Sequence, residues 1–167
     1  MWSHRKICLA ALLVFTGAPG LRAEWKAGDA LPALAGMELA GGGVPPTAGQ
    51  VVLVDFWASW CAPCKASFPA YARLHQEYTQ PGLLIIAVGV DEQPAAYAGF
   101  LKKLNPPFLT LHDHHQKLVS LAKVPAMPTS YLFGRDGRLR FIHQGFHGKE
   151  TEAEMRREIE LLLNEKA

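Results

Sequence analysis

Two continuous apolar runs, separated by a helical pattern, dominate the hydrophobic pattern of this chain. Residues 51–57 are apolar except for Asp55, and residues 83–90 read LLIIAVGV. Uninterrupted runs of this length predict strands that are buried on both faces, as in a parallel sheet. The segment between them repeats apolar side chains at helical spacing, namely Phe68, Tyr71, Leu74 and Tyr78. Two buried strands joined by a helix predict a parallel βαβ unit.

Shorter patterns extend this alternation of strands and helices to the end of the chain. The predicted ranges are 94–104 and 116–122 for helices, and 108–111, 129–133 and 138–144 for strands. The prolines at 106 and 107 end the first of these helices. A hairpin turn at 135–137 joins the last two strands. The whole series predicts an α/β fold.

The segments at either end of this series have weaker patterns. Residues 24–50 are rich in Gly, Pro and Ala, which predicts loops with at most a short hairpin around 37–39 and Val44. Thr151 and Glu154 match a capping box that would open the last helix. That helix would pack through an apolar stripe made of Met155, Ile159, Leu162 and Leu163.

The composition is that of one globular domain. The chain has 167 residues, of which 49% are hydrophobic and 19% charged, values that fit neither a disordered chain nor a membrane bundle. Three basic residues and no acid lie in the first 23 residues, which leaves 14 basic and 15 acidic residues in the rest. Such a nearly neutral body gives no electrostatic reason to expect nucleic-acid binding. We expect it to act as a monomer.

Residues 1–23 have the pattern of a secretory signal peptide. Arg5 and Lys6 precede the apolar run 7–15, and small residues lead to an expected cleavage site after Ala23. The run is too short to span a bilayer, although an uncleaved anchor remains an alternative. We therefore expect a periplasmic protein whose domain covers residues 24–167, and Cys8 would be lost with the leader.

Cleavage would leave Cys61 and Cys64 as the two cysteines, at the junction between a buried strand and a helix. Free backbone N–H groups and the helix dipole favour a thiolate at such a junction. Pro63 fits the first helical turn because it needs no hydrogen-bond acceptor there and its φ is already helical. We infer that Cys61 is the exposed nucleophile and that Cys64, one turn deeper, is the resolving thiol.

Three other interpretations of this pair stay open from the residues alone. A structural disulfide would close only a four-residue loop, for which chain entropy gives about 2 kcal/mol. Half of a zinc site would need a second pair of ligands, and the chain has no histidines at finger spacing. Inert buried thiols fit poorly with the neighbours Trp60 and Pro63. We favour redox chemistry, which suits an exported protein without a disulfide framework.

Asp55 is the second candidate for chemistry in this region. A carboxylate inside a buried apolar strand is desolvated, which raises its pKa and suits it to carry protons. The alternative is a carboxylate hydrogen-bonded into the core without a catalytic role.

Residues 54–65, VDFWASWCAPCK, resemble the active-site segment of the thioredoxin superfamily, and the Trp-Cys-Ala-Pro-Cys form resembles its TlpA/ResA branch of secreted thiol–disulfide oxidoreductases. Pro69 matches the family's helix-kinking proline, and 124–129 resembles the loop with its cis-proline, here Pro128. The resemblance implies a thioredoxin-like fold with a mixed central sheet flanked by helices. It also implies that 24–50 is an N-terminal extension and that a strand and a helix are inserted before the cis-proline.

The same resemblance implies a cycle of thiol–disulfide exchange without cofactor or metal. The Cys61 thiolate would attack a client's disulfide, and Cys64 would resolve the mixed disulfide. Asp55 would lie behind Cys64 and assist its deprotonation. The expected docking surface consists of Trp60, Pro63, Met127 and Pro128, where an extended client segment would pair with the backbone of 126–127.

The residues between the cysteines indicate the direction of electron flow. Ala62 and Pro63 provide no cation of the kind that stabilises the thiolate of strong oxidants such as DsbA. We therefore expect a reductant, kept reduced by a membrane electron donor of the DsbD/CcdA type. Expected clients are cysteine pairs of secreted metalloproteins, in cytochrome c or cytochrome oxidase maturation. The cytochrome c members carry a Glu after the cis-proline, whereas Thr129 and Ser130 follow here.

Two alternatives of other kinds remain. One is a general disulfide oxidase or isomerase of secreted proteins. The other is a non-catalytic copper or zinc carrier that would use the cysteines and the histidines of 112–115, HDHH. Adjacent histidines point in different directions, and Asp113 more simply caps the next helix.

Overall fold

The structure, a computed structural model, describes residues 24–165. The expected signal peptide therefore lies outside the described residues. The strands are β1 (Ala40–Gly41), β2 (Val51–Trp57), β3 (Leu83–Gly89), β4 (Leu109–His112), β5 (Thr129–Phe133) and β6 (Leu139–Gln144). The helices are the 3-10 turn η1 (Leu34–Gly36), α1 (Ala62–Tyr78), α2 (Pro94–Leu104), α3 (Lys117–Ala122) and α4 (Lys149–Asn164). Within this described part, no helix combines the length and the apolar character that a membrane span requires.

The strands form one mixed sheet in the order β1-β4-β3-β2-β5-β6. β2 is parallel to β3 along its whole length and antiparallel to β5 on its other side. All seven residues of β2 are buried, as its continuous apolar run predicts. β5 and β6 form a hairpin whose turn is closed by the Gly134 N–H donating to the Arg138 carbonyl at 2.9 Å. The predicted βαβ unit and the predicted hairpin are both confirmed.

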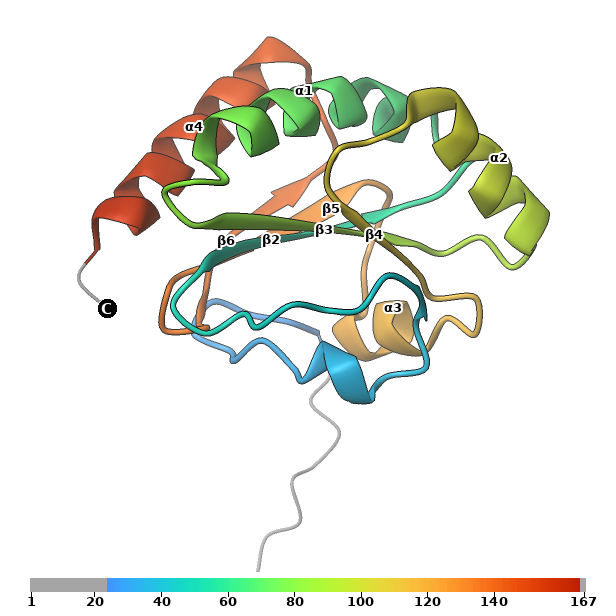
Figure 1. The fold of residues 1–167 in the computed structure, drawn as a ribbon, viewed down its shortest axis with the longest axis horizontal. Helices are drawn as coiled ribbons and strands as arrows, with labels where there is room; N and C mark the ends of the chain where they lie inside the picture. Colours follow the sequence, from blue (N-terminus) through green and yellow to red (C-terminus); the bar gives the residue numbers. More distant parts are fainter. Residues whose placement is uncertain (1–23, 166–167) are drawn as a thin grey trace, which may run out of the picture.

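Helices cover both faces of the sheet (Figure 1). α1, α2 and α4 lie on one face, while α3 and the segment before β2 lie on the other. On the first face, the Trp57 ring stacks on Phe100 of α2 at 4.3 Å and meets Phe68 of α1 edge-on at 5.2 Å between centroids. These contacts fix the start of α1, the end of β2 and the last turns of α2 against one another. The α4 stripe is buried at Met155, Ile159 and Leu162, as predicted.

Trp25 closes the opposite face of the sheet. Its side chain is 7% exposed, and its ring lies edge-on to Phe56, Tyr131 and Phe133 at centroid distances of 5.8, 5.0 and 5.7 Å. Its backbone N–H also donates to the Ala122 carbonyl of α3 at 3.3 Å. The beginning of the 24–50 segment is therefore part of the core and not a loose arm.

The short hairpin expected within 37–44 does not form in this described segment. Ala40 pairs instead with His112, and Gly41 with Leu111, so that β1 extends the far edge of the sheet beside β4. A two-residue strand is too short to build a hairpin of its own, and the β4 edge offers unpaired backbone groups.

The capping box expected at the start of the last helix is also wrong. α4 begins at Lys149 with Gly148 as its N-cap, so Thr151 lies inside the first turn. Its hydroxyl accepts a hydrogen bond from the His147 N–H at 3.0 Å, outside the helix. Thr151 therefore ties the preceding loop to the helix instead of capping its first residues.

Candidate active site

Cys61 and Cys64 lie at the predicted junction between β2 and α1. Cys61 is the N-cap residue of α1, and its sulfur accepts a hydrogen bond from the Cys64 N–H at 3.1 Å. The two sulfurs form a disulfide, with the Cα atoms 5.3 Å apart. The structure thus represents the oxidised pair. The same N–H group is placed to stabilise negative charge on the Cys61 sulfur once the bond opens.

Both cysteines are less accessible than the sequence suggests. Cys61 is 4% exposed and Cys64 is fully buried. The predicted order of depth is correct, but the prediction of an exposed Cys61 is wrong for this oxidised state. The bond to Cys64, which lies on the buried face of α1, draws the Cys61 sulfur towards the helix and away from solvent.

The loop just before the cysteines is held by Asp91, which follows β3. The Asp91 carboxylate is buried and accepts hydrogen bonds from the Ser59 N–H at 3.0 Å and the Ser59 hydroxyl at 2.7 Å. The next side chain, Trp60, is 70% exposed, and Pro63 is exposed as well. Two of the predicted docking side chains therefore lie at the surface, Trp60 on a loop with a fixed base and Pro63 in the first turn of α1.

The peptide bond between Met127 and Pro128 is cis, as the resemblance implies. Thr129, the next residue, pairs with Phe56 of β2. Pro128 thus lies at the end of β2 from which the cysteine loop departs. Pro128 is buried and Met127 half-buried. The Ala126 carbonyl, expected to be open to a client, already accepts a hydrogen bond from the Thr129 hydroxyl at 2.8 Å.

Asp55 is fully buried beside two hydroxyl groups that the sequence analysis did not identify. The Ser130 hydroxyl donates to Asp55 Oδ1 at 2.7 Å, and the Tyr71 hydroxyl donates to the same oxygen at 3.0 Å. These two hydroxyls lie 2.8 Å from each other. Asp55 Oδ2 has no hydrogen-bond partner among residues 24–165. One carboxyl oxygen is therefore held by two donors and the other is left to an apolar environment.

This environment raises the pKa of the Asp55 carboxyl group towards neutral pH. Burial raises the pKa of Asp55 from 3.8 to about 7, and the hydrogen bonds from Ser130 and Tyr71 oppose a further rise. The direction is the one predicted for a desolvated acid. A carboxyl group with such a pKa can take up or release a proton near neutral pH. Burial and the nearby Asp55 charge raise the pKa of Tyr71 well above its usual range, so Tyr71 remains a hydroxyl donor.

Ser67 and Tyr71 connect the carboxyl group to the helix that begins with the cysteines. The buried Ser67 hydroxyl donates to the Cys64 carbonyl at 3.0 Å. The neighbouring Ser67 hydroxyl also lowers the Tyr71 pKa, against the larger effect of burial. Cys64, Ser67 and Tyr71 all lie on the buried face of α1. The sequence did contain a signal for this arrangement. Ser67 and Tyr71 are four residues apart, so their hydroxyl groups share one helix face, and that helix must pack over the strand that contains Asp55.

The rings of His112, His114 and His115 lie close together, with centroid distances of 5.4 Å between His112 and His114 and 3.8 Å between His114 and His115. The expectation that adjacent histidines point in different directions is therefore wrong for His114 and His115. The His112 Nε2 atom hydrogen-bonds with the Asp91 carbonyl at 2.6 Å, and its ring stacks on Tyr97. Asp113 accepts hydrogen bonds from the N–H groups of Lys117 and Val119, which confirms its predicted capping role. In residues 24–165, no group of three or more His, Cys, Asp and Glu side chains is arranged to hold a metal ion.

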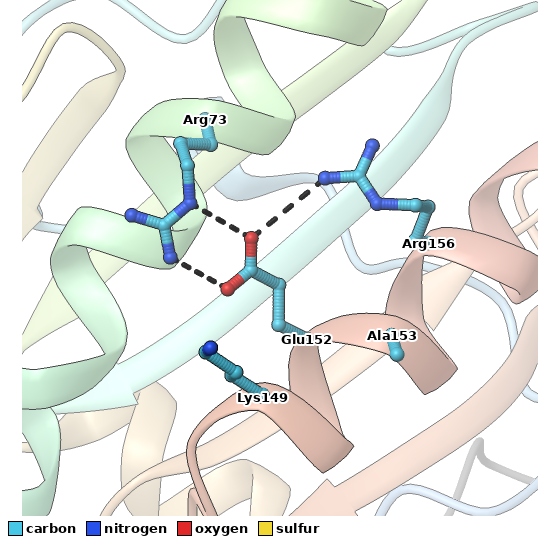
Figure 2. A pocket seen from close by; sticks show the side chains of 5 residues that line it. All are labelled: Arg73, Lys149, Glu152, Ala153 and Arg156. Carbon is cyan, nitrogen blue, oxygen red and sulfur yellow. Dashed lines mark hydrogen bonds and ion pairs between the residues drawn. The ribbon is translucent and has the colours of Figure 1, made fainter.

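A separate hollow of about 460 Å³ lies between α1 and α4, lined by charged residues. Figure 2 shows Glu152 accepting two hydrogen bonds from Arg73 at 2.9 and 2.6 Å, with Arg156 on its other side at 3.7 Å. Arg73 lies nine residues after Cys64, roughly 13 Å along the helix. The hollow is thus remote from the cysteines, and its ion pairs attach α4 to α1.

The Redoxin family model matches residues 26–159, which include the sheet, both cysteines and the cis-proline. The chain belongs to the Redoxin family. It is 35% identical over 97 residues to the thiol-disulfide oxidoreductase ResA of Oceanobacillus iheyensis, covering 58% of this chain and 50% of that protein. ResA of Bacillus subtilis is 31% identical over 91 residues, covering 54% and 51%. The chain spans about half the length of these curated relatives.

Among solved structures, this Redoxin-family chain is similar to a candidate thiol:disulfide interchange protein DsbE from Chlorobium tepidum. The TM-score is 0.78 at 32% sequence identity, over 84% of this chain and 100% of that one. These findings confirm a TlpA/ResA-like member of the thioredoxin superfamily with the thioredoxin-like fold that was predicted.

Proposed function

We propose that this protein is a thiol–disulfide oxidoreductase in which Cys61 and Cys64 exchange electrons with cysteine pairs of client proteins. The main support is the disulfide at the N-terminus of α1, whose Cys61 sulfur already receives a backbone N–H. Its similarity to proteins named as thiol-disulfide oxidoreductases agrees with this chemistry. No cofactor or metal enters the proposed cycle.

In the reducing direction, the Cys61 thiolate attacks one sulfur of a client disulfide and releases the other client sulfur as a thiolate. The Cys64 thiol then loses its proton and attacks the Cys61 sulfur of the mixed disulfide. This second step frees the remaining client sulfur and forms the Cys61–Cys64 disulfide. Two electrons have passed to the client, and its two thiolates take up the proton lost by Cys64 and one proton from solvent.

Asp55 is the proposed acceptor of the Cys64 proton. Its pKa of about 7 lies closer to that of a thiol than an ordinary carboxyl does, which lowers the cost of the transfer. Ser130 and Tyr71 keep the carboxyl group in one orientation. Ser67 and Tyr71 provide hydroxyl groups between the acid and the backbone of Cys64.

The docking surface for clients consists of Trp60, Pro63, Met127 and Pro128, which surround the end of β2. Trp60 offers an exposed aromatic face, and Met127 a deformable apolar one. An extended client segment would lie along the Met127 backbone, in the manner of an added strand.

We further propose that the protein works as a reductant outside the cytoplasm, after export through residues 1–23, with electrons from a membrane donor of the DsbD/CcdA type. The absence of a cation at Ala62 and Pro63 supports this direction. Cysteine pairs of secreted metalloproteins, as in cytochrome maturation, are the proposed clients. Members that act on cytochrome c carry a Glu after the cis-proline. This chain has Thr129 and Ser130 there, and the Ser130 hydroxyl donates a hydrogen bond to Asp55.

Trapping of mixed disulfides tests this function. Cys64→Ser should accumulate clients bonded to Cys61 when the full chain is expressed in an exporting bacterium, and dithiothreitol should release them. Cys61→Ser should trap few or none. Equal trapping by both variants would contradict the assignment of the two thiols. Failure of both variants to trap any client would contradict the oxidoreductase function.

A further inference from the structure

A hollow of about 420 Å³ opens next to the cysteine loop, between the first turn of α1 and the exposed side of α2. Ser59 and Lys65 line it on the cysteine side, and Gly99, Phe100 and Lys103 line it on the α2 side. It is distinct from the docking surface proposed above, whose residues do not line it. The hollow thus extends the surface around the cysteines towards α2.

The floor and one wall of this hollow are firmly held. Phe100 is 6% exposed and stacks on Trp57, the last residue of β2. Ser59 is fixed by the buried Asp91 carboxylate through its N–H and its hydroxyl. A partner that enters the hollow would therefore meet a preformed surface and would lose little binding energy to ordering it.

The rim of the hollow carries positive charge without a counterion. Lys65 and Lys103 are both exposed, and neither ammonium group has an ion pair or a hydrogen bond in the described part of the chain. Elsewhere on the protein, Arg73 is paired with Glu152 and Lys117 with Glu38. None of the described residues that line the hollow is acidic, and the nearby Asp91 carboxylate accepts the hydrogen bonds of Ser59. Two unbalanced charges on opposite walls favour an anionic group between them.

The identity of the group that binds in this hollow rests on the proposed function, in which a client protein docks at the cysteines. The Lys65 N–H lies 3.4 Å from the Cys61 carbonyl, so the hollow begins one helical turn from the reacting sulfur. An extended chain advances about 3.3 Å per residue, so residues a few positions from a client's cysteine can reach it. We infer that the hollow binds the segment flanking the client's reacting cysteine, with an Asp or Glu side chain held between Lys65 and Lys103.

Two synthetic peptides with the same internal disulfide test this inference, one with Glu and one with Gln at the positions two to four residues from the cysteine. The reduced wild-type protein should reduce the Glu peptide about fivefold faster at low salt, and about equally fast in 1 M NaCl, where screening is nearly complete. Lys103→Gln should remove most of this preference. Lys102→Gln, the neighbouring exposed lysine that does not line the hollow, should keep it.

A second pair of variants separates docking from long-range attraction. A Cβ atom added at Gly99 would meet no heavy atom within 4 Å, so Gly99→Phe can place its ring in the hollow while both lysines remain. It should abolish the preference for the Glu peptide, whereas Ala98→Phe, on the same helix but outside the hollow, should not. An equal rate for both peptides in the wild type, or a preference that survives Gly99→Phe, would overturn the inference. If neither peptide is reduced, the proposed function itself fails.

Discussion

The Ser130 hydroxyl lies 2.7 Å from Asp55 Oδ1, and the two residues pair directly across β5 and β2. Ser130 is the second residue after the cis-proline Pro128, so one short strand bears both the proposed client loop and a donor to the buried acid. This arrangement links the two halves of the site through neighbouring strands. The orientation of the carboxyl group therefore depends on β5 as well as on α1.

Loss of the Ser130 hydroxyl should raise the pKa of Asp55. This hydrogen bond favours the ionised carboxylate, so Ser130→Ala removes a contact that opposes the effect of burial. The pKa should move above its wild-type value of about 7, as measured by NMR titration of the carboxyl carbon. Ser120→Ala, at an exposed position on α3, is the matched control. An unchanged Asp55 pKa in Ser130→Ala would show that the hydrogen bond does not stabilise the charge.

The buried acid should also make stability depend on pH. The pKa of Asp55 is about 7 in the folded protein and 3.8 in the unfolded chain, so the folded state binds its proton more tightly. Its contribution to the free energy of unfolding is fully present below about pH 4 and is lost as the pH rises through about 7, by about 4 kcal/mol in total. Urea unfolding between pH 4.5 and 8 should reveal this decline. Asp55→Asn should flatten it, and an equal slope in both proteins would exclude Asp55 as its source.

Substitutions at Trp25 and Trp60 should have different effects, the first on the stability of the fold and the second on the rate of reaction with clients. Trp25 is buried against three aromatic rings, so Trp25→Ala should lower the free energy of unfolding by about 3–5 kcal/mol. Trp60 is 70% exposed, so Trp60→Ala should change stability by less than about 0.5 kcal/mol while it slows the reduction of a protein disulfide. Urea unfolding and an insulin-reduction assay measure the two effects. A stable Trp25→Ala protein would show that the 24–50 segment contributes little to the core.

The sheet and the position of the cysteines could be predicted because strong local patterns determine them. Residues 51–57, apolar except for Asp55, match β2, and residues 94–104 match α2. The raised pKa of Asp55 followed from one polar residue in a buried strand. In each case a single stretch of chain contains the relevant physical signal.

The features that could not be predicted depend on contacts between distant segments. β1 has its partner 72 residues away, in β4, and Trp25 packs on strands that come much later in the chain. Tyr71 fits an apolar helix face by its spacing, and only the fold shows that its hydroxyl meets Asp55. Thr151 has the right spacing for a capping box, but the loop at His147 takes its hydroxyl instead. Local propensity is a weak guide where tertiary contacts compete for the same group.

The most direct test is a redox titration of the chain from residue 24 in dithiothreitol buffers, with the free thiols of Cys61 and Cys64 counted by alkylation and mass spectrometry. We expect one two-electron transition with a midpoint below about −180 mV, the value of the disulfide isomerases. Cys61→Ser and Cys64→Ser should each abolish it. A midpoint near the −120 mV or so of DsbA would contradict a reductant. A pair that shows no transition at any potential would contradict the redox cycle itself.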